Sequence, residues 1–97
     1  MREYEVTVIL KPDLDDETRS ELIDRVENWL THSEDEADKP TADHWGQQRL
    51  AYPIEKETEG YYILFNSLLD TTKISELERN IQYVDDILRH LVVRKDG

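Results

Sequence analysis

The sequence contains no cysteine, three glycines, three prolines and little positive charge. The absence of cysteine excludes disulfides, thiolate chemistry and cysteine-ligated zinc, and it fits a reducing cytosol. Three glycines cannot compose a phosphate-binding loop, and neither the dinucleotide-binding nor the Walker spacing occurs. No apolar run approaches the ~20 residues of a membrane span, and the start of the chain shows no signal-peptide pattern. We therefore expect a cytoplasmic protein with no membrane partner.

Positive charge is scarce, with 12 lysines and arginines against 23 aspartates and glutamates, a formal net charge of −11. The summed field of such a chain repels phosphate, which argues against nucleic acid as a partner. A local cluster of arginines can still bind RNA while the rest of the surface stays acidic. With 97 residues, 37% hydrophobic and 36% charged, we expect one domain spanning residues 1–97, with a single modest core and a densely charged surface.

The first half of the chain is predicted to form a strand and a helix. Alternating apolar residues predict a strand at residues 3–10. Helical spacing of apolar residues predicts a helix from about residue 14 to about residue 31, with Asp13 or Asp15 as its N-cap. The acidic stretch 33–40 has no periodicity and is expected to be a solvated connection.

The second half begins with the stretch that we expect to organise the chain. Alternation predicts a strand at residues 42–52, with Trp45 on the side opposite to Gly46, and Pro53 places this strand at a sheet edge or ends it there. The next residues, 55–60, are expected to form a hairpin connection in which Gly60 is available for a positive φ.

Residues 61–66 are apolar on both sides, as in a central strand that is covered on both faces. A second helix is predicted after Asp70 and a last strand at residues 87–95. The order strand, helix, strand, strand, helix, strand predicts an α+β fold, in which a four-stranded antiparallel sheet carries both helices on one face. Because the helices cover only one face, the other face is expected to meet something else.

Residues that carry catalytic or metal chemistry are few and scattered. His32, His44 and His90 have no second ligand at a fixed spacing, so no metal site is expected. No serine has a nucleophile-elbow setting, and the pair Asp15-Asp16 fits a helix start rather than a catalytic dyad. We expect no catalytic residue, no cofactor and no small-molecule substrate, and hence no enzyme.

Basic residues on strands or strand ends remain as candidates for an RNA site that would converge on one region of the sheet. These candidates are Arg2, Arg49, Arg89, Arg94 and Lys95. Scattered solubilising charges, or salt bridges with the surplus carboxylates, would explain them equally well. Strand aromatics such as Tyr61 and Phe65 would stack on bases in a sheet-based RNA reader, but aromatics on strands more often belong to the core.

Several stretches, in order along nearly the whole chain, resemble a known family. They are Met1-Arg2-Glu3-Tyr4-Glu5-Val6, Lys11-Pro12-Asp13-Leu14, Gly46 to Ile54 with its core Arg49-Leu50-Ala51-Tyr52-Pro53-Ile54, Gly60-Tyr61-Tyr62 and Leu91-Val92-Val93. Together they resemble the bacterial small-subunit ribosomal protein six family, and the stretch from residue 46 to residue 54 is the specific part.

The resemblance implies a ferredoxin-like fold and a structural role on the platform of the small ribosomal subunit. It also implies binding to small-subunit ribosomal RNA and pairing with small-subunit ribosomal protein eighteen. Carried over position by position, Arg2, Arg49 and Arg89 match basic positions of the family and become candidate phosphate contacts.

The resemblance makes the uncovered face of the sheet the candidate surface for the protein partner, with Tyr52, Tyr62 and Leu64 as its contact residues. The chain departs from the family at Gln48, where a basic residue is usual, and at Glu55, where a basic or small residue is common. We therefore expect RNA binding here to depend more on the protein partner than in other members.

A different class of function remains open at this point, because fold does not fix function. The alternative is a ferredoxin-like sensing or oligomerisation domain, which predicts self-association through the open sheet and no affinity for ribosomal RNA.

Overall fold

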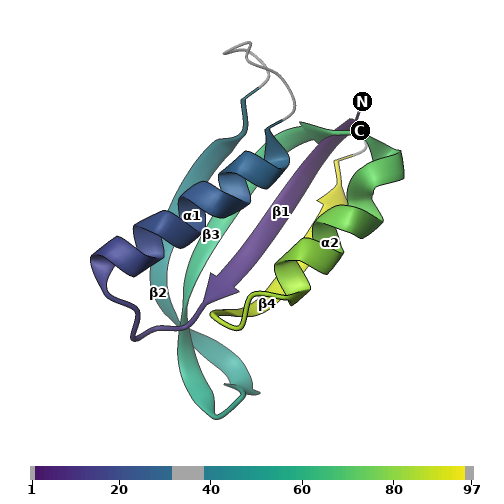
Figure 1. Cartoon of the computed structure of the whole chain (residues 1–97). Coiled ribbons are helices and arrows are strands. Elements are labelled where there is room, and N and C mark those ends of the chain that lie inside the picture. The colour runs from purple at the N-terminus through teal and green to yellow at the C-terminus, as the bar shows by residue number, and fades with distance from the viewer. Residues whose placement is uncertain (1, 32–38, 96–97) are drawn as a thin grey trace.

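The computed structural model describes residues 2–31 and 39–95 and contains one sheet and two helices. The elements are β1 (Arg2–Leu10), α1 (Asp16–Leu30), β2 (Thr41–Ile54), β3 (Glu57–Leu69), a 3-10 turn η2 (Thr71–Lys73), α2 (Ile74–Gln82) and β4 (Ile87–Arg94). The strand order is β2-β3-β1-β4, and every neighbouring pair is antiparallel. Both helices cover the same face of the sheet (Figure 1). The predicted α+β fold is confirmed, and most of the acidic connection predicted at 33–40 lies outside the described residues.

The first helix begins two residues later than the apolar spacing predicts, because Asp15 caps it. The Asp15 carboxylate accepts a hydrogen bond from the backbone N–H of Thr18 at 2.7 Å. Hydrogen bonds from Thr18 hold the pKa of Asp15 below its ordinary value of 3.8. The acidic side chains Asp16 and Glu17 occupy the first turn, where they face the positive end of the helix dipole. Of the two predicted N-caps, Asp15 is therefore the one that the structure uses.

The core lies between the two helices and the face of the sheet that they cover. Its buried side chains are Tyr4, Val6, Val8, Leu10, Leu22, Val26, Leu30, Ile63, Phe65, Leu69, Leu77, Ile81 and Ile87. In β1 and β3 these residues recur at every second position, so the intervening residues face the other way. We call the face of the sheet away from the helices the open face.

The second strand lies at the edge of the sheet, as Pro53 predicts, but its alternation is interrupted. The register with β3 shifts between His44 and Gly46, and Gly46 adopts a φ of 79°. This bulge turns Trp45 so that its ring stacks on that of Tyr62, with an interplanar angle of 9°. Tyr62 pairs directly with Gly46, so the two lie on the same face of the sheet. Because Trp45 stacks on Tyr62, it lies on that face too, and the prediction that it lies opposite to Gly46 is wrong.

The hairpin between β2 and β3 turns earlier than the sequence predicts. The turn consists of Glu55 and Lys56, whose φ angles are 49° and 71°, and Ile54 pairs with Glu57 on either side of it. Both central residues are left-handed, as in the two-residue hairpin turns that match strand twist. Gly60 lies within β3 instead and has no positive φ, so its predicted role is wrong.

Replacing Glu55 by asparagine and Lys56 by glycine is expected to raise the free energy of unfolding by about 1 kcal/mol. Neither native residue adopts a left-handed conformation easily, whereas Asn-Gly is the preferred pair for this turn. Urea unfolding measures the change. Glu55→Ala, Lys56→Ala is the matched control, since it removes the same two charges without relieving the backbone. An equal gain from that control would show that charge, not backbone conformation, limits the turn.

Candidate protein and RNA interface

Apolar side chains gather on one half of the open face. They come from all four strands and are Ile9, Trp45, Leu50, Tyr52, Tyr62, Leu64, Leu91 and Val93, which we call the apolar patch. Several of them are accessible, with exposed fractions of 50% for Trp45, 55% for Tyr52, 57% for Leu91 and 44% for Val93. Exposed apolar area of this kind marks a surface that binds another molecule.

The centre of the apolar patch lies around Thr7 in β1. Thr7 pairs with Leu64 of β3 on one side and with Leu91 of β4 on the other. The next residue of β1 on the open face is Ile9, which pairs with Tyr62 of β3 and Arg89 of β4. A hollow of about 220 Å³ is lined by Thr7, Ile9, Tyr62, Arg89, His90 and Leu91. The patch therefore has both exposed apolar side chains and a depression into which a partner's side chain fits.

The three residues predicted to contact a protein partner lie on this face. Tyr62 and Leu64 are alternate residues of β3. Tyr52 comes from the part of the β2–β3 hairpin that extends past the end of β1, and Figure 1 shows this arm projecting at the bottom of the view, where its two strands cross. Its ring lies 5.7 Å from the guanidinium carbon of Arg89 in β4. This contact places Tyr52 at the rim of the apolar patch.

Three of the five predicted RNA contacts gather at one end of the sheet. Arg94 pairs with Tyr4, and Arg2 lies two residues before Tyr4 on the same side of β1. The backbone N–H of Lys95 donates to the Glu3 carbonyl at 2.8 Å, and its Nζ donates to the Asn66 amide oxygen at 3.2 Å. The two chain ends lie side by side there (Figure 1). We call Arg2, Arg94 and Lys95 the basic end.

The other two candidates lie apart from the basic end. Arg89 is at the start of β4, on the open face beside the apolar patch. Arg49 is on the hairpin arm, where its partner across the strands is Glu59. The five basic residues therefore do not converge on one region: three form a group, and two stand alone.

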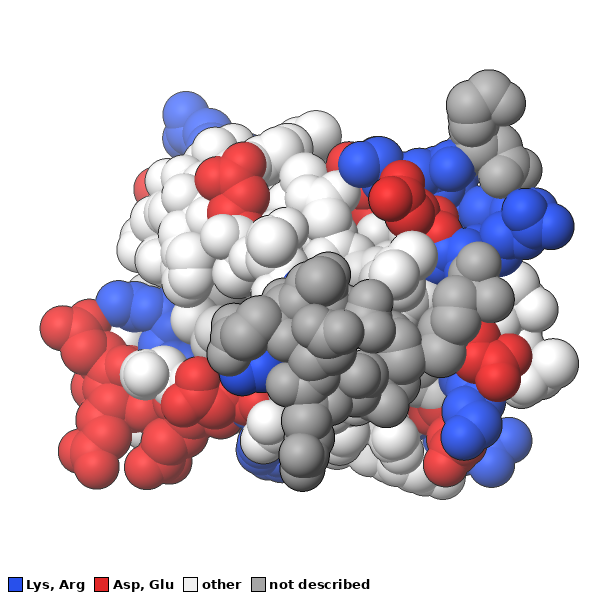
Figure 2. All heavy atoms as spheres, turned by 90° about the horizontal axis from the view of Figure 1, so that it is seen from above, with Lys and Arg blue, Asp and Glu red and all other residues white. Residues whose placement is uncertain are grey.

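Acidic side chains concentrate on the first helix. Its exposed carboxylates include Asp16, Glu17, Glu21 and Asp24. Viewed from above, Asp and Glu atoms crowd the lower left of the molecule, on the side where Figure 1 places the start of α1 (Figure 2). More Lys and Arg atoms gather at the upper right. Because carboxylates repel a phosphate backbone, the start of α1 is unsuited to binding a nucleic acid.

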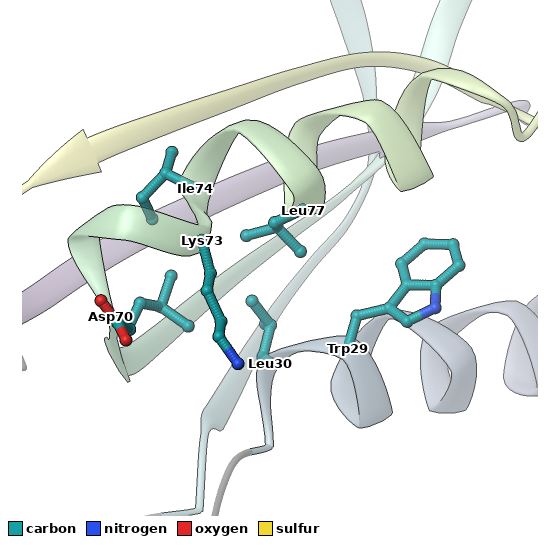
Figure 3. A pocket seen from close by; sticks show the side chains of 7 residues that line it. Trp29, Leu30, Asp70, Lys73, Ile74 and Leu77 are labelled. Carbon is teal, nitrogen blue, oxygen red and sulfur yellow. The ribbon is translucent and has the colours of Figure 1, made fainter.

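A cavity of about 250 Å³ lies between the end of α1 and the start of α2. Its lining residues are Trp29, Leu30, Leu69, Asp70, Lys73, Ile74 and Leu77 (Figure 3). The Asp70 carboxylate accepts hydrogen bonds from the backbone N–H and hydroxyl of Thr72, at 3.0 and 2.8 Å, which lower its pKa. A carboxylate stabilised in its charged form is a poor general base, and the Lys73 side chain points toward Leu30 at the negative end of α1 (Figure 3).

Residues 2–31 and 39–95 offer neither a metal-ion cluster nor a membrane-spanning helix. No group of three or more histidine, aspartate or glutamate side chains in these ranges is placed to hold a metal ion. Within the same ranges, no helix has the length and apolar character needed to cross a membrane.

Sequence reasoning missed part of the apolar patch and all of the contact between Arg89 and Tyr52. Leu91 and Val93 alternate with the half-buried Val92, so strand alternation could have placed them on the open face. No sequence signal places Tyr52 near Arg89, because that contact depends on the path of the hairpin arm.

A ferredoxin-like fold with an uncovered, partly apolar sheet face defines a protein that acts by binding.

Comparison with known proteins identifies the class of binding protein. The family model described as "Ribosomal protein S6" matches residues 3–94. The small ribosomal subunit protein bS6 of Caldanaerobacter subterraneus is 44% identical over 98 residues, covering 99% of each chain, and that of Thermoanaerobacter pseudethanolicus is 43% identical over 96 residues with the same coverage. The crystal structure of 30S ribosomal protein S6 from Thermotoga maritima superposes with a TM-score of 0.84 at 28% identity, covering 97% of this chain and 87% of that one.

The chain belongs to the ribosomal protein S6 family. It is therefore a protein of the small ribosomal subunit, works on the ribosome in the cytoplasm, and is a structural protein, not an enzyme. This membership favours the ribosomal interpretation over a sensing or oligomerisation domain.

Proposed function

We propose that this protein binds small-subunit ribosomal RNA in the platform of the subunit, together with ribosomal protein eighteen. The observation that carries the proposal is the division of the molecule's surface. The apolar patch lies on the open face, whereas Arg2 and Arg94 of the basic end leave the strands on the face of the helices. A protein partner and RNA can then bind side by side without competing for the same residues.

The apolar patch supports the part of the proposal that concerns a protein partner. Leu91 and Val93 are 57% and 44% exposed, although neither carries a polar group that water would solvate. Tyr52, Tyr62 and Leu64 surround the same region and add aromatic area, which is enriched in the centres of protein interfaces. Covering these residues by ribosomal protein eighteen would remove their apolar area from water.

The basic end supports the part that concerns RNA. Arg2, Arg94 and Lys95 come from the two chain ends and present three cationic groups away from the acidic α1. Arg49 stays a predicted phosphate contact, although its cross-strand neighbour Glu59 offsets its charge. So few cations give a weak electrostatic contribution to RNA binding. We therefore propose that the protein partner supplies much of the remaining affinity.

Neutralising the basic end tests the RNA site. In the presence of ribosomal protein eighteen, the variant Arg2→Gln, Arg94→Gln, Lys95→Gln should bind the platform RNA more weakly than the wild type. Each lost phosphate contact lowers the slope of log K against log salt by about 0.7–0.9, so the slope should fall by about 2 to 3. The matched control neutralises three basic residues elsewhere, Arg25, Lys56 and Arg79. Equal slopes for the two triple variants would show that the basic end is not the RNA site.

A further inference from the structure

We propose that Arg89 contacts the protein partner and not RNA. Its guanidinium group, held on the ring of Tyr52, binds a carboxylate of the partner, and an apolar side chain next to that carboxylate enters the hollow beside Tyr62. This inference rests on the proposed function, since it assigns a role within the proposed interface with ribosomal protein eighteen. It also gives Arg89 a different role from the phosphate contact that the sequence predicts.

The position of Arg89 separates it from the basic end. Arg89 pairs with Ile9, so its side chain lies on the open face, whereas Arg94 pairs with Tyr4 and lies on the face of the helices. Five residues of extended strand place the two arginines about 17 Å apart. A single phosphate group cannot bridge that distance, and the two side chains leave the sheet in opposite directions.

The contact with Tyr52 restricts where the guanidinium group lies. The distance of 5.7 Å from its carbon to the ring centroid is within the range of a cation–π interaction. Such stacking leaves the N–H groups at the edge of the guanidinium plane available, and their fork geometry fits two carboxylate oxygens. Tyr52 therefore restricts the arginine before binding, which lowers the entropy lost when a partner binds.

The surroundings of Arg89 favour a protein over RNA. Within residues 2–31 and 39–95, Arg89 takes part in no ion pair, so its charge is available to a ligand. It lines the hollow of about 220 Å³ with Ile9, Tyr62 and Leu91, which are apolar or aromatic. A protein segment can supply an apolar side chain and a carboxylate together. An RNA backbone would leave these apolar side chains against a highly hydrated surface.

The test measures binding of ribosomal protein eighteen in the absence of RNA. Arg89→Met keeps an apolar stem over Tyr52 but removes the charge, and it is expected to weaken binding about tenfold. Arg79→Met is the matched control, because it makes the same change at an exposed arginine of α2, on the side of the helices, and its binding should stay within about twofold of the wild type. Tyr52→Leu should weaken binding less than Arg89→Met, and the double variant should show less than the sum of the two effects.

A second arm measures RNA binding by the assembled pair across a range of salt. Arg89→Met should leave the salt slope unchanged. The inference is overturned if Arg89→Met leaves binding of the protein partner unchanged, and a slope lowered by about 0.7–0.9 would then assign Arg89 to a phosphate. If the wild-type chain fails to bind ribosomal protein eighteen at all, the proposed function fails too, which distinguishes that outcome from a failure of Arg89 alone.

Discussion

Replacing Leu64 by aspartate is expected to weaken binding of ribosomal protein eighteen by about 100-fold. Leu64 lies next to Thr7 in the centre of the apolar patch, where a bound partner would exclude water. Burying a carboxylate there without a counter-ion costs about 3 kcal/mol or more, which corresponds to this loss of affinity. Isothermal titration with the purified partner measures the effect.

Two further variants separate binding from folding. Leu64 is half-buried, so its replacement also lowers stability, whereas Leu91 on the other side of Thr7 is 57% exposed. Leu91→Asp should therefore weaken binding to a similar degree with little change in the melting temperature. Tyr83→Asp is the control, because Tyr83 is 79% exposed at the end of α2, on the side of the helices. If Leu64→Asp and Leu91→Asp bind the partner as well as Tyr83→Asp does, the apolar patch is not the interface.

Replacing Gly60 by alanine is expected to lower the free energy of unfolding by about 2 kcal/mol. A Cβ atom at this position would lie near the Cγ2 atom of Ile9 and 3.4 Å from the carbonyl oxygen of Leu10. Ile9 is 8% exposed and packs in the sheet, so it cannot move away freely. Overpacking of this kind costs about 1–3 kcal/mol. A loss of stability would point to this steric contact, since replacing glycine by alanine normally stabilises a strand.

A double-mutant cycle with Ile9→Ala tests the steric cause. Ile9→Ala removes the Cγ2 atom, so Gly60→Ala should be neutral or slightly stabilising in that background. Urea unfolding of the four proteins gives the coupling free energy directly. Equal costs of Gly60→Ala in both backgrounds would mean that Ile9 is not the obstacle.

Much of the fold could be predicted from the sequence, because local patterns determine it. Alternation located the strands, and Asp15 and Pro53 marked a helix start and an edge strand through their own hydrogen-bonding chemistry. The role of Gly60 could not be predicted in this way. Glycine is compatible with a positive φ and with close packing, and only the tertiary contact with Ile9 decides between them.

The candidate site was predictable only where it follows strand alternation. Tyr62 and Leu64 could be placed on one face because they are alternate residues of a central strand. Trp45 could not, since a bulge at Gly46 reverses its side. The opposite faces of Arg89 and Arg94 follow from alternation in β4 and could be predicted in the same way. The contact between Arg89 and Tyr52 could not, because it depends on the path of the hairpin arm, which no local pattern determines.

The most direct test of the account is the binding of a platform fragment of small-subunit ribosomal RNA, titrated with and without ribosomal protein eighteen over a range of salt. With a net charge of −11 and a basic end of three residues, the chain alone should bind the fragment weakly at about 0.15 M salt, and adding the partner should produce tight binding. Tight binding without the partner would contradict the proposed dependence on it. No binding in either case, together with self-association, would favour an oligomerisation role for the open face.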